Sequence, residues 1–185
     1  ENKRNWRPNI ILFSGGESAR PHLVELGLAL TGKLGALTDF NLLIDTKETP
    51  DTLTSRTIKK RNYFKRSIKC ESMLQGVETV TSAYGFSGFE PNTVLMGWSG
   101  DAHSAENLAA VLKNMRSKNL NTIFLDYHKE NGFGRKQQID IWWNGKGRHL
   151  SFSLNMMRFI LNDPRWRDAQ LRILIVNSDS SLNDR

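Results

Sequence analysis

Cysteine is almost absent from this sequence, since Cys70 is the only one among 185 residues. A single cysteine excludes an internal disulfide and a metal site built from cysteines alone. The histidines lack the close His-His or Cys-His spacing of a zinc site, lying at His22, His103, His128 and His149. The composition therefore fits a reducing compartment, and we expect no metal site.

Long apolar runs are also missing. No stretch of about 18 apolar residues occurs, so we expect no membrane-spanning helix within this sequence. The opening residues, Glu1 to Asn5, lack both the apolar segment of a signal peptide and an initiator methionine. We therefore expect this sequence to be a piece of a longer chain.

Positive charge exceeds negative charge, with a net charge of +7 and an isoelectric point near 9.7. The basic residues form several separate groups, of which Arg56 to Lys69 is the longest. No zinc-finger spacing, RNP-like aromatic motif or helix-turn-helix pattern accompanies them, so we expect no nucleic-acid partner. Such groups are typical of solvated faces, or of a protein close to the anionic cytoplasmic leaflet of a membrane.

Short apolar runs alternate with amphipathic segments along most of the chain. The runs predicted as strands are Asn9 to Phe13, Leu37 to Ile44, Phe64 to Cys70, Thr93 to Met96, and Asn121 to Tyr127. The segments predicted as helices run from Pro21 to near Gly32 or Gly35, Thr49 to about Tyr63, Ser72 to Tyr84, and Ser104 to Met115. Repeated units of this length predict an α/β fold with a mostly parallel, doubly wound sheet flanked by helices.

Two glycine loops follow predicted strands, at the edge of the sheet where such folds bind ligands. The first contains Ser14, Gly15 and Gly16, and the second contains Gly97, Ser99 and Gly100. Glycines, hydroxyls and free amides at a helix start can hold a phosphate, so both loops are candidate nucleotide sites. Neither has the ending of a P-loop, and short loops also need glycine for geometry alone. Nucleotide binding and simple turn formation both remain open.

A hydrolase is a third hypothesis for the second loop. Ser99 stands where a nucleophile elbow has its serine, but Asp101 replaces the second glycine of that motif. Asp101 and His103 are near Ser99 only along the chain, whereas triad members meet through the fold. We therefore expect no enzyme activity.

The stretch from Gln138 to Val176 holds three of the five tryptophans. An alternating run ending in Trp142 and Trp143 predicts a strand, and a helix from about Leu150 is expected to stop before Pro164. A continuous apolar run from Leu171 then predicts a strand covered on both faces. Adjacent tryptophans on a strand face opposite sides. Internal packing and an interface are therefore both open for Trp142, Trp143 and Trp166.

Three groups of residues in this sequence resemble the cytosolic C-terminal domain of cation-chloride cotransporters, a branch of the amino acid-polyamine-cation transporter superfamily. They are Asn5-Trp6-Arg7-Pro8 before a strand, Pro91 to Trp98, and Ile139 to Trp143 followed by Trp166-Arg167 and Leu171-Arg172. They occur in the family's order along most of the chain.

The resemblance implies an α/β fold related to the universal stress proteins, on the cytosolic side of the membrane. It also implies a domain that helps to dimerise the transporter, regulates transport and in some members binds adenine nucleotide. The short segment Lys129 to Gln137 stands where animal members carry a long regulatory insert, so phosphorylation of that insert is not carried over.

These inferences combine into one predicted domain over residues 1–185. It has a first lobe at 1–128, a connector at 129–137, and a strand-helix-strand part at 138–185 that in the family leads toward a second lobe. The predicted role is non-catalytic regulation and dimerisation of a secondary transporter at the cytoplasmic side of the cell membrane. Its expected partners are the transmembrane domain of the same chain and a second copy, with ATP or ADP as an effector. The alternative is a free-standing universal-stress-type protein that binds adenine nucleotide.

Overall fold

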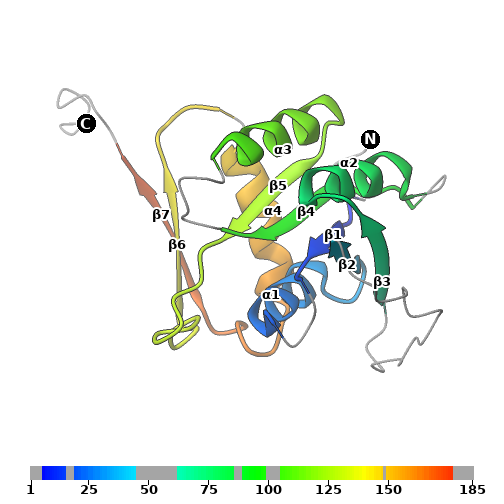
Figure 1. Cartoon of the computed structure of the whole chain (residues 1–185). Coiled ribbons are helices and arrows are strands. Elements are labelled where there is room, and N and C mark those ends of the chain that lie inside the picture. Colours follow the sequence, from blue (N-terminus) through cyan, green and yellow to red (C-terminus); the bar gives the residue numbers. More distant parts are fainter. Residues whose placement is uncertain are drawn as a thin grey trace. The chain divides into compact units, whose positions relative to one another are not determined.

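A computed structural model describes residues 6–15, 19–44, 62–85, 89–98, 105–147 and 149–176. It divides into two compact units, Glu1–Tyr127 and His128–Arg185 (Figure 1). The predicted helix from Thr49 to about Tyr63 lies almost entirely outside the described residues. No helix in the described part of the chain is long and apolar enough to cross a bilayer.

The first unit is built on a five-stranded sheet whose strands all run parallel. The strand order is β3-β2-β1-β4-β5. The strands are β1 (Asn9–Phe13), β2 (Ala36–Ile44), β3 (Tyr63–Cys70), β4 (Thr93–Gly97) and β5 (Asn121–Leu125). Neighbouring strands need crossover connections because they are parallel, which is the arrangement that the strand-helix alternation predicted. The α/β prediction is confirmed.

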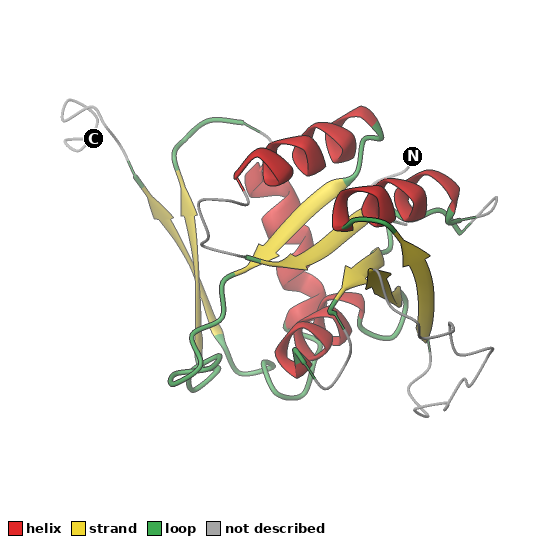
Figure 2. Cartoon of the chain, in the orientation of Figure 1, coloured by secondary structure: helices red, strands yellow, loops and turns green. Residues whose placement is uncertain are grey.

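Helices cover both faces of this sheet (Figure 2). Helices α2 (Met73–Ala83) and α3 (Ala105–Ser117) pack against each other on one face. Helix α1 (Pro21–Thr31) contacts β1, β2 and β4. Pro21 begins α1 because proline fits a first helical turn, and the Ser72 hydroxyl caps α2 by accepting a hydrogen bond from the Gln75 amide.

The core of the first unit lies on both sides of the central strands. Ile11, Leu12 and Leu95 are completely buried, as expected for parallel strands covered by helices on both faces. The face beneath α2 and α3 is filled by one cluster of buried side chains: Ile11, Phe13, Phe40, Val77, Val80, Val94, Met96, Val111 and Met115. On the α1 side, Gly27 allows close approach, because a Cβ there would lie 2.9 Å from the side chain of Leu37.

The second unit contains β6 (Gln138–Trp143), α4 (His149–Ile160) and β7 (Gln170–Ile175). β6 and β7 pair in parallel with Ile141 opposite Ile173, and α4 contacts β6. The expectation that the last strand is covered on both faces is wrong for the described residues. There β7 pairs only with β6, and Ile175 is 64% exposed. An apolar run alone does not distinguish a covered strand from one whose apolar face has no cover.

Candidate functional site

A cavity of about 350 Å³ opens at the carboxyl ends of the strands in the first unit. It lies on the α2 and α3 side of the sheet, where β1 stands between β2 and β4. The chain order reverses at this strand, which is the position where open α/β sheets bind ligands. The cavity is lined by Phe13, Gly15, Arg20, Phe40, Leu42, Ile44, Met73, Leu74, Met96, Gly97, Trp98, Asn107, Leu108, Val111 and Phe124.

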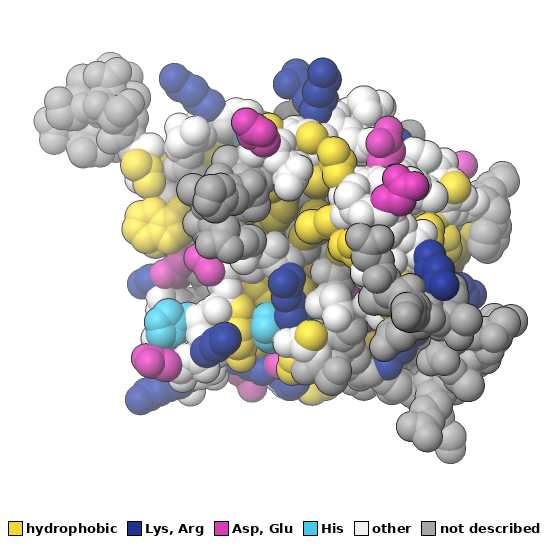
Figure 3. Space-filling view, in the orientation of Figure 1, with side chains coloured by type: hydrophobic (Ala, Val, Ile, Leu, Met, Phe, Trp, Pro, Cys, Tyr) yellow, Lys and Arg dark blue, Asp and Glu magenta, His cyan; other side chains and the backbone are white. Residues whose placement is uncertain are grey.

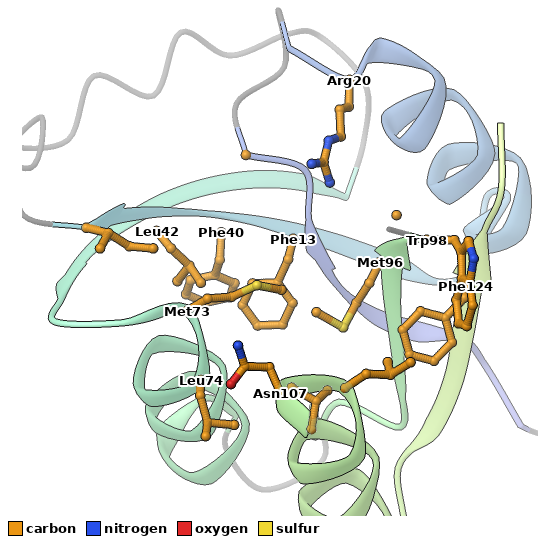
Figure 4. Close-up of a pocket in the computed structure, with 15 residues that line it drawn as sticks. Phe13, Arg20, Phe40, Leu42, Met73, Leu74, Met96, Trp98, Asn107 and Phe124 are labelled. Carbon is orange, nitrogen blue, oxygen red and sulfur yellow. The ribbon is translucent and has the colours of Figure 1, made fainter. Parts of the chain in front are cut away.

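The walls of this cavity are mainly apolar (Figure 4). The floor is formed by side chains that belong to the core, among them Phe13 and Met96. At the rim, Met73 is 49% exposed and Trp98 is 48% exposed. Apolar side chains are also visible at the surface between α2 and α3 (Figure 3). The cavity is thus an apolar hollow that continues the core outward to solvent.

Arg20 is the cationic side chain of the described cavity wall. It is the N-terminal cap residue of α1, and its guanidinium points from the rim toward the cavity (Figure 4). It passes close over the end of β4, because a Cβ at Gly97 would lie 2.9 Å from Nη1 of Arg20. No hydrogen bond or ion pair joins Arg20 to another residue in the described ranges, so a charged donor faces the opening. Asn107 on α3 contributes an amide side chain at the opposite wall (Figure 4).

The structure places the predicted loop residues in different environments. Gly15 and Gly97 both line the cavity, and Gly15 has a φ of 72°, a conformation that favours glycine. Ser14 is fully buried, and because side chains alternate along a strand it faces away from the cavity that Phe13 lines. Gly16, Ser99 and Gly100 lie outside the described residues, as do Asp101 and His103 of the hydrolase hypothesis. Those assignments stay predictions.

The buried hydroxyl of Ser14 belongs to a polar cluster around Asp39 of β2. The Ser14 hydroxyl donates to Oδ2 of Asp39 at 2.9 Å, and the Ser14 amide donates to Oδ1 at 3.3 Å. The Tyr63 hydroxyl donates to the same carboxylate at 3.2 Å. Burial nevertheless raises the pKa of Asp39 above its ordinary value of 3.8, against the lowering effect of these hydrogen bonds. Ser14 therefore ties the end of β1 to β2 and does not present its hydroxyl to a ligand.

The three tryptophans of the second unit separate into one exposed and two packed side chains. Trp142 is 70% exposed, whereas the indole of Trp143 is half-buried and donates to the Lys146 carbonyl. Trp166 is 8% exposed and meets Phe133 edge to face, with the Lys136 ammonium over its ring. Trp166 thus packs internally, so its burial favours the first of the two alternatives that the sequence left open for it. Trp142 retains the exposure that an interface anchor needs.

An ion pair bridges the two strands of the second unit on the face that carries Trp142. Nε and Nη2 of Arg172 each donate to one carboxylate oxygen of Asp140 at 2.8 Å. The hydrogen bonds from Arg172 hold the pKa of Asp140 below its ordinary value. The sequence had placed Asp140 in the predicted strand, but only the parallel register sets it opposite Arg172. The pair helps to hold the register of the two strands.

Sequence reasoning missed most of the cavity. The sequence pattern identifies Arg20 only as the residue before a helix start, and it indicates no ligand contact for Met73 or Phe124. The available signal was positional, because Arg20 follows the first glycine loop and Trp98 directly follows Gly97. The side chains from α2, α3 and β5 carry no motif and become cavity walls only through packing.

The comparison with solved structures points in the same direction as the sequence resemblance. No family model and no curated protein sequence matches the chain. Its structure is similar to one described as the cytoplasmic domain of a prokaryotic cation chloride cotransporter, with a TM-score of 0.69 and 15% sequence identity. The match covers 92% of this chain and 66% of that chain, so the present chain spans about two thirds of the protein it matches. The chain has the fold of the cytoplasmic domain of a cation-chloride cotransporter.

Proposed function

We propose that this chain is a non-catalytic cytosolic domain of a secondary transporter of the cation-chloride cotransporter type, and that it regulates and helps to dimerise the parent protein. The observation that carries the proposal is a fold shared over 92% of the chain with such a domain. Three groups of sequence motifs support the same assignment. In this proposal the domain lies at the cytoplasmic side of the cell membrane. Its partners are the transmembrane domain of the same chain and a second copy of itself.

The lining of the cavity supports a role without catalysis. Among the described residues that line it, the polar side-chain groups belong to Arg20, Asn107 and the indole N–H of Trp98, and none is a serine, cysteine, histidine, aspartate or glutamate. A nucleophile with an adjacent base is the usual requirement for covalent catalysis, and the described wall holds neither. We therefore propose that the cavity binds an effector without chemical change.

The exposed Trp142 supports the dimerisation part of the proposal. A large aromatic side chain that is 70% exposed is a good candidate for a buried anchor in an interface. The neighbouring ion pair between Asp140 and Arg172 gives the same face a polar rim.

Sedimentation of the full 185-residue chain tests the dimer. We expect a reversible monomer-dimer equilibrium that Trp142→Ser shifts toward the monomer by at least tenfold in the dissociation constant, a typical loss for an aromatic anchor. Leu34→Ser is the matched control, because Leu34 is 61% exposed and lies in the first unit. A monomer at all concentrations, or equal effects of the two substitutions, would contradict a dimer built on Trp142.

The effector that we propose first is an adenine nucleotide, ATP or ADP, held at the strand ends by Gly15 and Gly97. Calorimetric titration into the unchanged chain and into Gly97→Val tests it, since a side chain at position 97 would displace Arg20, which lines the cavity. Saturable binding that Gly97→Val abolishes supports nucleotide sensing. Nucleotide binding in a protein that is monomeric and has no transmembrane part favours the alternative, a free-standing nucleotide-binding protein. If millimolar nucleotide produces no heat of binding, the nucleotide is removed from the proposal, and docking and dimerisation remain.

A further inference from the structure

The chemistry of the cavity wall favours a class of ligand other than nucleotides. The volume of about 350 Å³ lies at the lower end of the range for small-molecule sites, which is roughly 300–1,000 Å³. Such sites combine a mostly apolar lining with a few placed polar groups, as this one does. Ligands with a large polar surface would lose hydration against this wall without regaining hydrogen bonds.

The apolar part of the wall is suited to a ligand of adaptable shape. Met73 and Met96 contribute flexible thioether side chains, which adjust to ligands of different outline. Trp98 and Phe124 meet edge to face at a centroid distance of 5.7 Å and form one end of the cavity. Both Met73 and Trp98 are about half exposed, so a ligand that covers them removes apolar surface from water.

Among the described residues of the wall, the charged group is the guanidinium of Arg20. Arg20 has no hydrogen-bonded or ionic partner among the described residues, and it points toward the opening (Figure 4). A guanidinium binds a carboxylate through two parallel hydrogen bonds, and it does so more strongly than a neutral donor would. The one positive charge of Arg20 balances one negative charge on a ligand. A triphosphate brings several charges, for which the described wall offers no second cation.

We infer that this cavity binds an amphipathic monoanion, a molecule with an aliphatic or aromatic body and one carboxylate, with the carboxylate on Arg20 and the body between Met73, Met96 and Phe124. Medium-chain fatty acids and aromatic carboxylic acids share this chemistry. The inference rests on the effector part of the proposed function, where the monoanion competes with the nucleotide for the same cavity. It requires neither a dimer nor a transmembrane partner.

Calorimetric titration of the full 185-residue chain with four probes tests the inference. Decanoate has both features, decanol has the apolar body alone, acetate has the carboxylate alone, and ATP is the competing ligand. We expect saturable binding of decanoate, binding of decanol at least about tenfold weaker, and no binding of acetate or ATP, since charge-assisted hydrogen bonds contribute on the order of tenfold or more in affinity.

Two variants assign the binding to this cavity. Arg20→Gln should weaken decanoate about tenfold and leave decanol unchanged, whereas Arg158→Gln, at an exposed arginine of the second unit, should change neither. Leu108→Trp should fill the cavity and weaken both probes. Circular dichroism establishes whether each variant is folded. If Leu108→Trp does not fold, Met73→Ala at the exposed rim replaces it as the cavity variant.

Several results would overturn the inference. ATP binding without decanoate binding would restore the nucleotide as effector, and equal affinities for decanoate and decanol would remove the role of Arg20. Decanoate binding that survives both Arg20→Gln and the cavity variant would place the ligand elsewhere. Sedimentation of the same samples measures the dimer separately, so a failure of this inference is distinguishable from a failure of the proposed function.

Discussion

At the scale of single residues, the buried carboxylate of Asp39 shows how the sheet edge near the cavity is secured. Asp39 is 5% exposed and accepts hydrogen bonds from the hydroxyl and amide of Ser14 and from the hydroxyl of Tyr63. These bonds link the end of β1 and the start of β3 to the middle of β2. Because burial raises its pKa, the folded protein binds the Asp39 proton up to a higher pH than the unfolded chain does.

The first prediction concerns the pH dependence of stability at Asp39. Its pKa is raised on folding, so its contribution to stability is greatest below the ordinary value of 3.8 and falls as pH rises toward the folded pKa. We expect Asp39→Asn, which cannot ionise, to gain stability relative to the unchanged chain as pH rises above 3.8. Urea unfolding at a series of pH values measures this difference.

Asp163 is the control, because folding shifts its pKa in the opposite direction. The hydrogen bonds from Arg165 lower the pKa of Asp163, so its contribution is present above 3.8 and is lost as pH falls through the folded pKa. Asp163→Asn should therefore lose stability relative to the unchanged chain as pH rises from below the folded pKa toward 3.8, with little further change at higher pH. The same trend for both variants would contradict the burial effect at Asp39.

A second prediction at this scale concerns the hydrogen bonds of Asp39. Asp39→Ala leaves three donors without their acceptor at a buried position, which costs about 1–3 kcal/mol of the free energy of unfolding. Asp39→Asn keeps one acceptor oxygen and should cost less. Denaturant unfolding at neutral pH checks the order, and an alanine variant as stable as the asparagine variant would show that the three bonds do not contribute.

At the scale of elements, helix α2 positions one side of the cavity through its first turn. Met73 and Leu74 line the cavity and directly follow Ser72, whose hydroxyl accepts the Gln75 amide at 3.2 Å. The cap satisfies an amide that has no partner within the helix, and it sets where the helix begins. A frayed first turn would move both cavity residues.

We therefore expect Ser72→Ala to cost about 1 kcal/mol of the free energy of unfolding, the typical value for loss of a cap. Ser82→Ala is the control in the same helix, because the Ser82 hydroxyl is exposed and donates only to the Glu78 carbonyl one turn back. Thermal or urea unfolding measures both variants. A larger loss for Ser82→Ala would show that the cap is not what stabilises α2.

At the scale of the whole molecule, the net positive charge links the proposed location at the membrane to a measurable affinity for anionic lipid surfaces. The net charge is +7, and the edge strand β3 presents the exposed cations Lys65, Arg66 and Lys69. Basic residues near an anionic membrane surface contribute about 1 kcal/mol each, and salt screens the attraction over roughly 10 Å. The same lysines and arginine also protect the edge strand from pairing with other chains.

We expect the chain to sediment with vesicles that contain phosphatidylserine and not with vesicles of phosphatidylcholine alone. Raising the salt concentration to 0.5 M should release it, because the attraction is electrostatic. Binding that persists in high salt would indicate apolar insertion. An absence of binding to either vesicle would contradict direct contact of this domain with the membrane surface.

The sequence by itself determined the order and type of the elements that the structure describes. Local patterns sufficed because each strand is a short apolar run and each helix has its own boundary signals, such as Pro21 at the start of α1 and Ser72 before α2. These signals depend only on residues that are close together in the chain, so they can be recognised without knowledge of the fold. The glycines that line the cavity were also visible, because a turn after a strand requires them.

Only the tertiary structure decided what those elements enclose. The cavity joins side chains from β1, β2, β4, β5, α2 and α3, and Arg20 reaches it over Gly97 from the start of α1. The burial of Ser14 against Asp39, and of Trp166 against Phe133, likewise depends on residues distant in the chain. Strand order and packing set these contacts, and neither is encoded in a local period of apolar residues.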